Sequence, residues 1–142
     1  MSEMEIQTKK KWLYRYRDNK LKIKRLENKL KEIDSRMKSP RSVTFSNMPK
    51  GERITVEDFI SEKEDLEKRI VLQKKKGLVY RQEIVAVIDE MENSKYAEVL
   101  ELWFIDGYNA DEIAEAMGYS TRYIFSLYSK ALDQIDISRC VE

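Results

Sequence analysis

The sequence contains no histidine and only one cysteine, Cys140. Without histidine, the chain lacks the commonest general base and the commonest metal ligand of proteins. A single cysteine excludes an internal disulfide and fits the reducing cytoplasm. The sequence also has no phosphate-binding loop, no nucleophile elbow and no CxxC pair. We therefore expect no enzymatic activity, no cofactor and no metal site.

Glycine and proline are scarce as well, with four glycines and two prolines in 142 residues, of which 37% are charged. So little turn-forming material beside so much lysine, glutamate and leucine predicts long helices and an all-α fold. No apolar run approaches the roughly 20 residues of a membrane-spanning helix, and the charged N-terminus lacks the apolar core of a signal peptide. We therefore expect a cytoplasmic protein that does not enter a membrane.

Charge is unevenly distributed along the chain. Residues 1–41 carry 14 basic and 6 acidic side chains, a net charge of +8, whereas residues 42–94 carry 9 and 11, a net charge of −2. Residues 95–142 carry 4 basic and 9 acidic side chains, a net charge of −5. The basic N-terminal arm and the acidic C-terminal tail predict two surfaces with different partners.

The first long helix is predicted over residues 5–38. Apolar side chains recur there at alternating steps of four and three, which is the heptad seam of a coiled coil. Asn19 is the polar member of this seam, and one buried amide can fix the register and number of paired helices. The helix should end at Ser39-Pro40, since proline moves the preceding residue away from helical angles. The seam residues are Trp12, Tyr16, Asn19, Ile23, Leu26, Leu30, Ile33 and Met37.

A linker over residues 39–54 and a second long helix over residues 56–91 follow. The linker contains both prolines together with several serines and threonines, a composition typical of loops. The second helix keeps the three-four spacing of apolar residues, which weakens at Lys63, Gln73 and Gly77. We expect fraying, a kink or a close helix approach at Gly77, because glycine has no side chain to fill the seam.

These segments predict a long helical hairpin or coiled coil over residues 1–93, followed by a small C-terminal helix-turn-helix bundle over residues 94–142. Antiparallel pairing across the linker would cover both apolar seams within one chain, and parallel pairing between two copies would cover them between chains. The sequence leaves both arrangements open. The two long seams also favour a homo-oligomer that forms through these helices.

Residues 109–132 predict a helix, a tight turn and a second helix. Asn109 is suited to cap the first helix, and Ser120 is suited to cap the second. Gly118 falls where a left-handed residue is needed after a helix. Ala114 is small where two helices that cross at a steep angle would approach closely. This layout is typical of a DNA-binding helix-turn-helix, whose second helix enters the major groove.

The residues of this corner and of the helix before it resemble region 4 of bacterial sigma factors, over Ser94–Ile135. The matching positions are Tyr96 to Trp103, Asp106-Gly107-Tyr108, Glu112-Ile113-Ala114, Met117-Gly118-Tyr119-Ser120, Ile124, Leu127, Ala131 and Leu132. The order of a long charged helical region, a break and this tail is similar to small regulators of Gram-positive phages and prophages, including late-transcription activators. The resemblance implies a transcriptional regulator that binds double-stranded DNA in the host cell cytoplasm.

By this resemblance, helix 121–134 reads the major groove. The positions that would meet base edges are Thr121, Arg122, Phe125 and Ser126. Arginine can bind guanine with two hydrogen bonds, hydroxyls can bond either kind of edge, and phenylalanine can contact a thymine methyl. Phosphates would be met by Tyr123, Ser129 and Lys130, and by the backbone N–H groups that follow Ser120.

The tail departs from the sigma pattern in charge, since Arg122 and Lys130 are the only cations of helix 121–134. Phosphate neutralisation supplies most non-specific affinity for DNA. Either the basic first helix supplies the missing contacts through Lys9, Lys10, Lys11, Arg15 and Arg17, or the tail binds something other than DNA. The alternative for the three lysines is a solvated helix face. Two alternatives to a DNA-binding protein therefore remain: a regulator that binds a repressor or RNA polymerase, and a structural helical adaptor.

Overall fold

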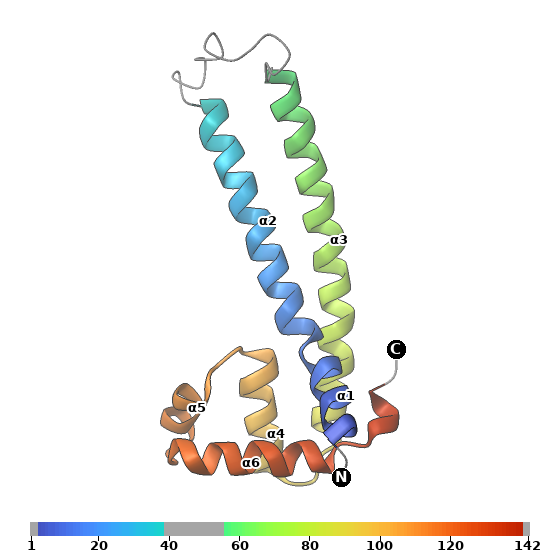
Figure 1. Cartoon of the computed structure of the whole chain (residues 1–142), viewed down its shortest axis with the longest axis vertical. Helices are drawn as coiled ribbons and strands as arrows, with labels where there is room; N and C mark the ends of the chain where they lie inside the picture. The colour runs from blue at the N-terminus through green and yellow to red at the C-terminus, as the bar shows by residue number, and fades with distance from the viewer. Residues whose placement is uncertain (1–2, 39–55, 141–142) are drawn as a thin grey trace. The chain divides into compact units, whose positions relative to one another are not determined.

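The computed structural model describes residues 3–38 and 56–140, and these residues form helices and connecting loops (Figure 1). The all-α fold predicted from the sequence is confirmed. The predicted linker at 39–54 lies outside the described residues. The helices are α1 (Glu3–Leu13), α2 (Arg15–Lys38), α3 (Val56–Asp89), α4 (Ser94–Leu100), α5 (Ala110–Met117) and α6 (Thr121–Gln134), with a π-helical turn η3 (Glu101–Ile105) and a 3-10 turn η4 (Ile137–Arg139).

The chain divides into two compact units. One unit is residues 20–76, and the other combines residues 1–19 with residues 77–142. Residues 1–19 and 77–93, which the sequence assigned to the coiled-coil region, therefore belong to the same compact unit as the helix-turn-helix corner. The domain boundary predicted between residues 93 and 94 stays a prediction.

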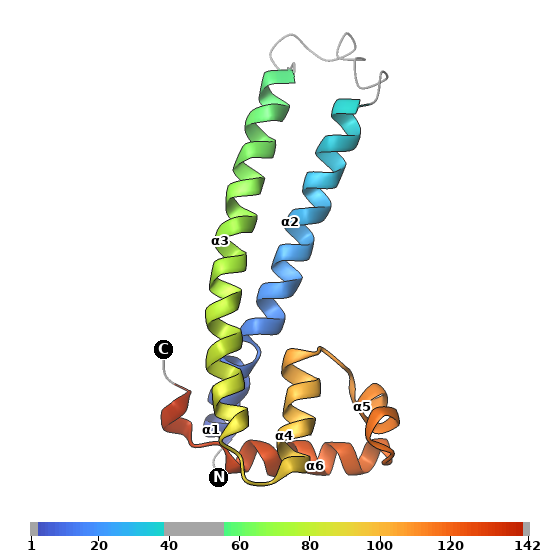
Figure 2. The same ribbon diagram turned by 180° about the vertical axis from the view of Figure 1, so that it is seen from behind.

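In the unit of residues 20–76, the described parts of α2 and α3 run antiparallel and form a hairpin (Figures 1 and 2). Of the two pairings that the sequence left open, the chain forms the antiparallel one. Lys63, a polar member of the predicted seam, pairs with Asp34 at 2.9 Å, and this carboxylate raises the pKa of Lys63. The buried residues of the hairpin are Leu26, Ile33, Phe59, Leu66 and Ile70.

The prediction of one unbroken first helix is wrong at Tyr14, which separates α1 from α2. Helical hydrogen bonds continue across this point, since the Tyr14 N–H donates to Lys10 O at 2.8 Å and the Asp18 N–H to Tyr14 O at 2.9 Å. The Tyr14 ring packs edge-on against Phe104 at 5.0 Å between centroids. Its hydroxyl accepts a hydrogen bond from Trp103 Nε1 at 2.9 Å. These contacts with a distant helix accompany the local deformation.

Gly77 lies where two helices approach closely, which is one of the three outcomes that the sequence predicted for it. A Cβ atom at this position would lie 2.4 Å from Oδ1 of Asn19, so the buried amide would have to shift to admit a side chain. Asn19 is buried, as its place in the heptad seam predicts. The glycine therefore makes room for a buried amide in the unit of residues 1–19 and 77–142.

The core of this unit is built around α4, η3, α5 and α6, with α1 packed against α6 and η4. The helix before the corner, α4 with its continuation η3, has a one-sided apolar face, on which Val99, Leu100 and Phe104 are fully buried. This helix ends in the π-helical turn η3, in which the Asp106 N–H donates to Glu101 O at 3.0 Å. Among residues 3–38 and 56–140, no helix is both long enough and apolar enough to cross a membrane.

Candidate nucleic-acid interface

The first helix of the corner, α5, begins at the cap that the sequence predicted. The Glu112 N–H donates to Asn109 Oδ1 at 2.9 Å, and the Asn109 N–H donates to Glu112 Oε1 at 3.1 Å. This reciprocal pair is a capping box, which satisfies two backbone donors that the helix itself leaves without partners. Asp111 in the same first turn places negative charge at the positive end of the helix dipole.

The turn between α5 and α6 also has the predicted geometry. Gly118 adopts φ 75° and ψ 33°, the left-handed conformation that side-chain-bearing residues adopt at a cost. Ser120 caps α6, since its Oγ accepts from the Tyr123 N–H at 3.1 Å. Ala114 is 6% exposed within the shared core. The local signals of the sequence thus specify the corner.

Helix α6 has one buried face and one face toward solvent. The buried face contains Ile124, Leu127, Ala131 and Leu132, which are positions that match the sigma factor pattern, together with Tyr128. Thr121 and Ser126 are half-buried. The predicted contact residues on the solvent face are Arg122, Tyr123, Phe125, Ser129 and Lys130, and Ser120 just before the helix is exposed as well.

Several of the predicted contact side chains are held by neighbours in the same unit. Thr121 Oγ1 donates a hydrogen bond to Asp111 Oδ1 at 2.8 Å. The Tyr123 ring packs edge-on against Tyr119, with 4.9 Å between centroids. Phe125 is 50% exposed, and its ring lies 6.2 Å from that of Trp103. None of these three contacts, including the hydrogen bond between Thr121 and Asp111, was predicted from the sequence.

The three lysines predicted to contact phosphates lie in different environments. Lys9 is only 2% exposed, and its Nζ donates to Leu132 O, near the end of α6, at 3.0 Å. A side chain buried in this way cannot reach a phosphate on the surface, so the prediction for Lys9 is wrong. Lys10 is half-buried, with its Nζ 5.8 Å from the centroid of the Tyr128 ring. Lys11 is exposed, as a phosphate contact requires.

A hollow of about 470 Å³ adjoins the start of α6. Arg17 is held at its edge, with Nη1 donating to Trp103 O at 3.1 Å and the guanidinium 5.5 Å from the Tyr14 ring. The sequence predicted Arg17 as one of the basic residues that could contact phosphates, but nothing local shows that its guanidinium meets Trp103, 86 positions away. The lining residues are Tyr14, Arg17, Trp103, Asn109, Ala110, Asp111, Thr121 and Phe125.

Tyr128, on the buried side of α6, has an altered acidity. Burial and the neighbouring Tyr14 raise the pKa of its phenol well above the ordinary value, because desolvation disfavours the charged form. Its ring stacks on Trp103 with 4.2 Å between centroids. Tyr128 therefore packs α6 against η3 through its contact with Trp103.

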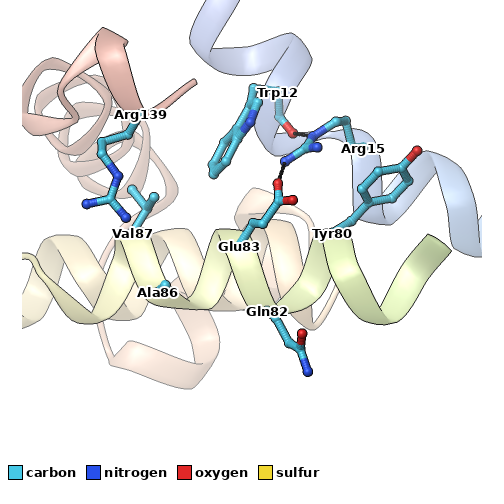
Figure 3. Close-up of a pocket in the computed structure, with 8 residues that line it drawn as sticks. All are labelled: Trp12, Arg15, Tyr80, Gln82, Glu83, Ala86, Val87 and Arg139. Atoms are coloured by element: carbon cyan, nitrogen blue, oxygen red, sulfur yellow. Dashed lines mark hydrogen bonds and ion pairs between the residues drawn. The ribbon is translucent and has the colours of Figure 1, made fainter. Parts of the chain in front are cut away.

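A second hollow of about 740 Å³ lies beside α3 (Figure 3). Its walls are formed mainly by Trp12, Tyr80 and Val87. The Arg15 guanidinium lies 4.5 Å from the Trp12 ring and 4.7 Å from the Tyr80 ring, and Nη2 donates to Glu83 at 2.8 Å. This hollow contains none of the residues of α6, and both of its arginines, Arg15 and Arg139, are paired with carboxylates.

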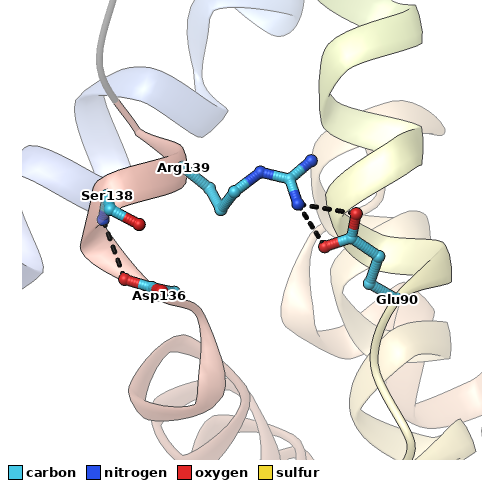
Figure 4. A network of polar contacts seen from close by, with 4 residues as sticks. All are labelled: Glu90, Asp136, Ser138 and Arg139. Carbon is cyan, nitrogen blue, oxygen red and sulfur yellow. Dashed lines mark hydrogen bonds and ion pairs between the residues drawn. The ribbon is translucent and has the colours of Figure 1, made fainter.

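The C-terminal turn η4 is attached to α3 by charge (Figure 4). Arg139 Nη1 donates to both carboxylate oxygens of Glu90, at 2.6 Å to Oε1, and this carboxylate raises the pKa of Arg139. The Ser138 N–H donates to Asp136 Oδ1 at 2.9 Å, which lowers the pKa of Asp136. Across the described part of the chain, no cluster of His, Cys, Asp or Glu has the arrangement of a metal site.

Comparison with known proteins identifies a family. One family model matches residues 42–136, a stretch that includes α3 and the whole helix-turn-helix corner. The chain belongs to the family DUF1492. This family is described as a protein of unknown function, so membership assigns no activity. No curated protein and no solved structure matches the chain.

Proposed function

We propose that this chain is a sequence-specific DNA-binding transcriptional regulator that reads the major groove with α6. The observation that carries the proposal is the exposure of Arg122 and Phe125 in the first turns of α6, directly after the left-handed Gly118. Recognition helices of this kind contact base edges with their N-terminal residues. The resemblance to sigma factor region 4 and to phage or prophage regulators supports the same function, performed in the host cell cytoplasm.

The five exposed residues proposed for α6 have chemistry suited to different parts of a DNA duplex. Arg122 can bind guanine O6 and N7 together, and Phe125 can press on a thymine methyl. Tyr123, Ser129 and Lys130 are positioned to donate to phosphates, which fix orientation without reading sequence. In this proposal Ser126 adds a hydroxyl contact to a base edge on the half-buried side of the helix.

The phosphate contacts that α6 lacks are supplied by the basic residues packed in the same compact unit. Lys11 is exposed, and Arg17 lines the hollow that also contains Thr121 and Phe125. Lys10, Lys11 and Arg17 are therefore the proposed phosphate contacts of the first helix, and the buried Lys9 is not one of them. Because each neutralised phosphate releases counterions, these residues should act on affinity and salt dependence for all sequences alike.

We also propose that the protein self-associates through its long helices. Apolar side chains of α3 remain exposed in both units, Val71 and Leu72 in residues 20–76 and Leu78 and Val79 in residues 77–142. Two copies would present two recognition helices to two half-sites, the usual arrangement of helix-turn-helix dimers. Sedimentation of the full chain at tens of micromolar should give a dimer or larger species, and a monomer would refute self-association.

A regulator that binds RNA polymerase or a repressor is the second candidate function. The observation that favours it is the acidic surface of α5, where Asp111, Glu112 and Glu115 are exposed in a tail of net charge −5. Such a surface repels phosphates and suits a basic protein surface.

Replacement of Arg122 by alanine separates the two functions. If α6 reads DNA, Arg122→Ala should weaken binding at the selected site by about 1–3 kcal/mol and relax preference at one base pair. Arg81→Ala, which removes an exposed arginine of α3, is the matched control and should leave that preference unchanged. Sites are first found by chromatin immunoprecipitation with the intact chain. If Arg122→Ala leaves specific DNA binding unchanged while capture of RNA polymerase falls, the protein-binding function is the correct one.

A further inference from the structure

The hydrogen bond between Thr121 and Asp111 joins the two helices of the corner at its exposed edge. Thr121 is the first residue of α6, and Asp111 lies in the first turn of α5. The distance between Thr121 Oγ1 and Asp111 Oδ1 is 2.8 Å. Both residues line the hollow at the start of α6, together with Phe125. The pair therefore stands where the proposed recognition helix would meet its first base.

The chemistry of the two groups fixes the direction of this hydrogen bond. A carboxylate has no proton to give and can only accept, whereas a hydroxyl has one proton and two lone pairs. The Thr121 hydroxyl must therefore use its single proton to donate the hydrogen bond to Asp111. Its lone pairs remain available, so toward any further partner the hydroxyl can act only as an acceptor.

We infer that Asp111 restricts Thr121 to accepting hydrogen bonds from DNA. Thr121 then selects a base whose major-groove edge offers an exocyclic amino group. An unconstrained threonine can bond to any base edge. An acceptor alone matches adenine N6 or cytosine N4, and it is repelled by guanine O6 and thymine O4. This inference rests on the proposed function, because it concerns the sequence that α6 reads. Asp111 is then a positioning residue that acts on specificity through Thr121.

The position of Asp111 is consistent with this role despite its charge. A carboxylate near the N-terminus of α6 lies at the positive end of that helix's dipole, which offsets part of its repulsion from DNA phosphates. Arg17 lines the same hollow and supplies the opposite charge. The carboxylate can thus stay beside Thr121 when the helix docks into a groove.

The test begins with in vitro selection of DNA sites by the full-length protein. The base pair read by Thr121 is the one at which Thr121→Val, which keeps the shape and removes the hydroxyl, loses its preference. Adenine or cytosine should face Thr121 there. Replacing that base by purine or pyrimidin-2-one, which lack the amino group, should weaken wild-type binding by about 2- to 10-fold, the range of one net hydrogen bond. The same replacement should not affect Thr121→Val.

Asp111→Asn tests the role of the carboxylate. An amide can donate as well as accept, so it frees the Thr121 proton, and discrimination between the two orientations of that base pair should fall toward unity. Glu115→Gln, which removes an equal charge from the exposed surface of α5, should raise affinity for all sequences and keep the discrimination. Guanine or thymine facing Thr121, or discrimination unchanged in Asp111→Asn, would overturn the inference and leave the proposed function standing. If the wild-type chain shows no sequence-specific binding at all, the proposed function fails and the inference fails with it.

Discussion

Substitution of Lys9 tests whether this residue of α1 stabilises the recognition helix α6 within the core or contacts DNA at the surface. Its side chain is 2% exposed, and its ammonium donates to Leu132 O near the C-terminal end of α6. A cation is favoured there by the helix dipole, and the Leu132 carbonyl has a second lone pair for it beside the bond that it accepts from the Ile135 N–H at 3.2 Å. Lys9→Ala would remove both the packed methylene stem and this hydrogen bond.

The size of the effect follows from three contributions. Truncating a buried, unbranched side chain to alanine costs about 2–5 kcal/mol, and a hydrogen bond from a charged donor contributes about 1.5–3 kcal/mol. Relief of the ammonium's desolvation, a few kcal/mol in the opposite direction, offsets much of the second contribution. We therefore expect Lys9→Ala to lower the free energy of unfolding by about 2–4 kcal/mol. Lys9→Met, which keeps the stem, should cost about 1 kcal/mol or less.

The assay is urea unfolding of the full chain followed by tryptophan fluorescence. Both tryptophans, Trp12 and Trp103, lie in the unit of residues 1–19 and 77–142, so the signal reports on the unit that contains Lys9. Lys11→Ala is the control, since Lys11 is exposed on the same helix. If Lys9→Ala and Lys11→Ala unfold within about 0.5 kcal/mol of each other, Lys9 does not stabilise this unit.

Three further substitutions test other parts of the structure. Gly77→Ala should destabilise the protein by about 1–3 kcal/mol, because the new Cβ would lie 2.4 Å from Asn19 Oδ1. Asn19→Ala should remove most of that penalty in the double variant, and additive effects would contradict the close approach. Gly118→Ala should cost about 1–2 kcal/mol at φ 75°, whereas Gly118→Asn, which tolerates this conformation, should cost less in the same urea series. The raised pKa of Tyr128 keeps its phenol neutral in the folded state, so stability present below pH of about 10 should fall as pH rises further. A pH series in which Tyr128→Phe falls as steeply as wild type would refute this contribution.

The helix-turn-helix corner shows how far local sequence signals reach. Asn109, Gly118 and Ser120 each act on backbone groups within a few residues of themselves. Their effects depend on side-chain oxygens and on the conformational freedom of glycine, not on distant partners. The structure confirms all three positions, and the buried face of α6 follows from helical periodicity in the same way.

The partners of the charged side chains on the first helix could not be predicted in this way. Periodicity places Asn19 on the seam, and one step of three back from Trp12 places Lys9 there as well, but it does not show which group would pair with a buried ammonium. The partner of Lys9, Leu132, is 123 residues away along the chain. The partner of Arg17, the Trp103 carbonyl, is 86 residues away. Such contacts exist only because α1 and the start of α2 pack against α6 and η3, and no local pattern encodes that packing.

The sequence by itself therefore determined the all-α fold, the positions of the helix caps and the face of α6 that is buried. These features depend on backbone hydrogen bonding and on the 3.6-residue period, which act over one or two helical turns. The tertiary structure alone decided that Lys9 donates to Leu132, that the first helix is interrupted at Tyr14 and that Thr121 donates to Asp111. Each of these depends on which distant segments share one core. The direction in which a hydroxyl or an ammonium donates is set by the partner that the fold places beside it.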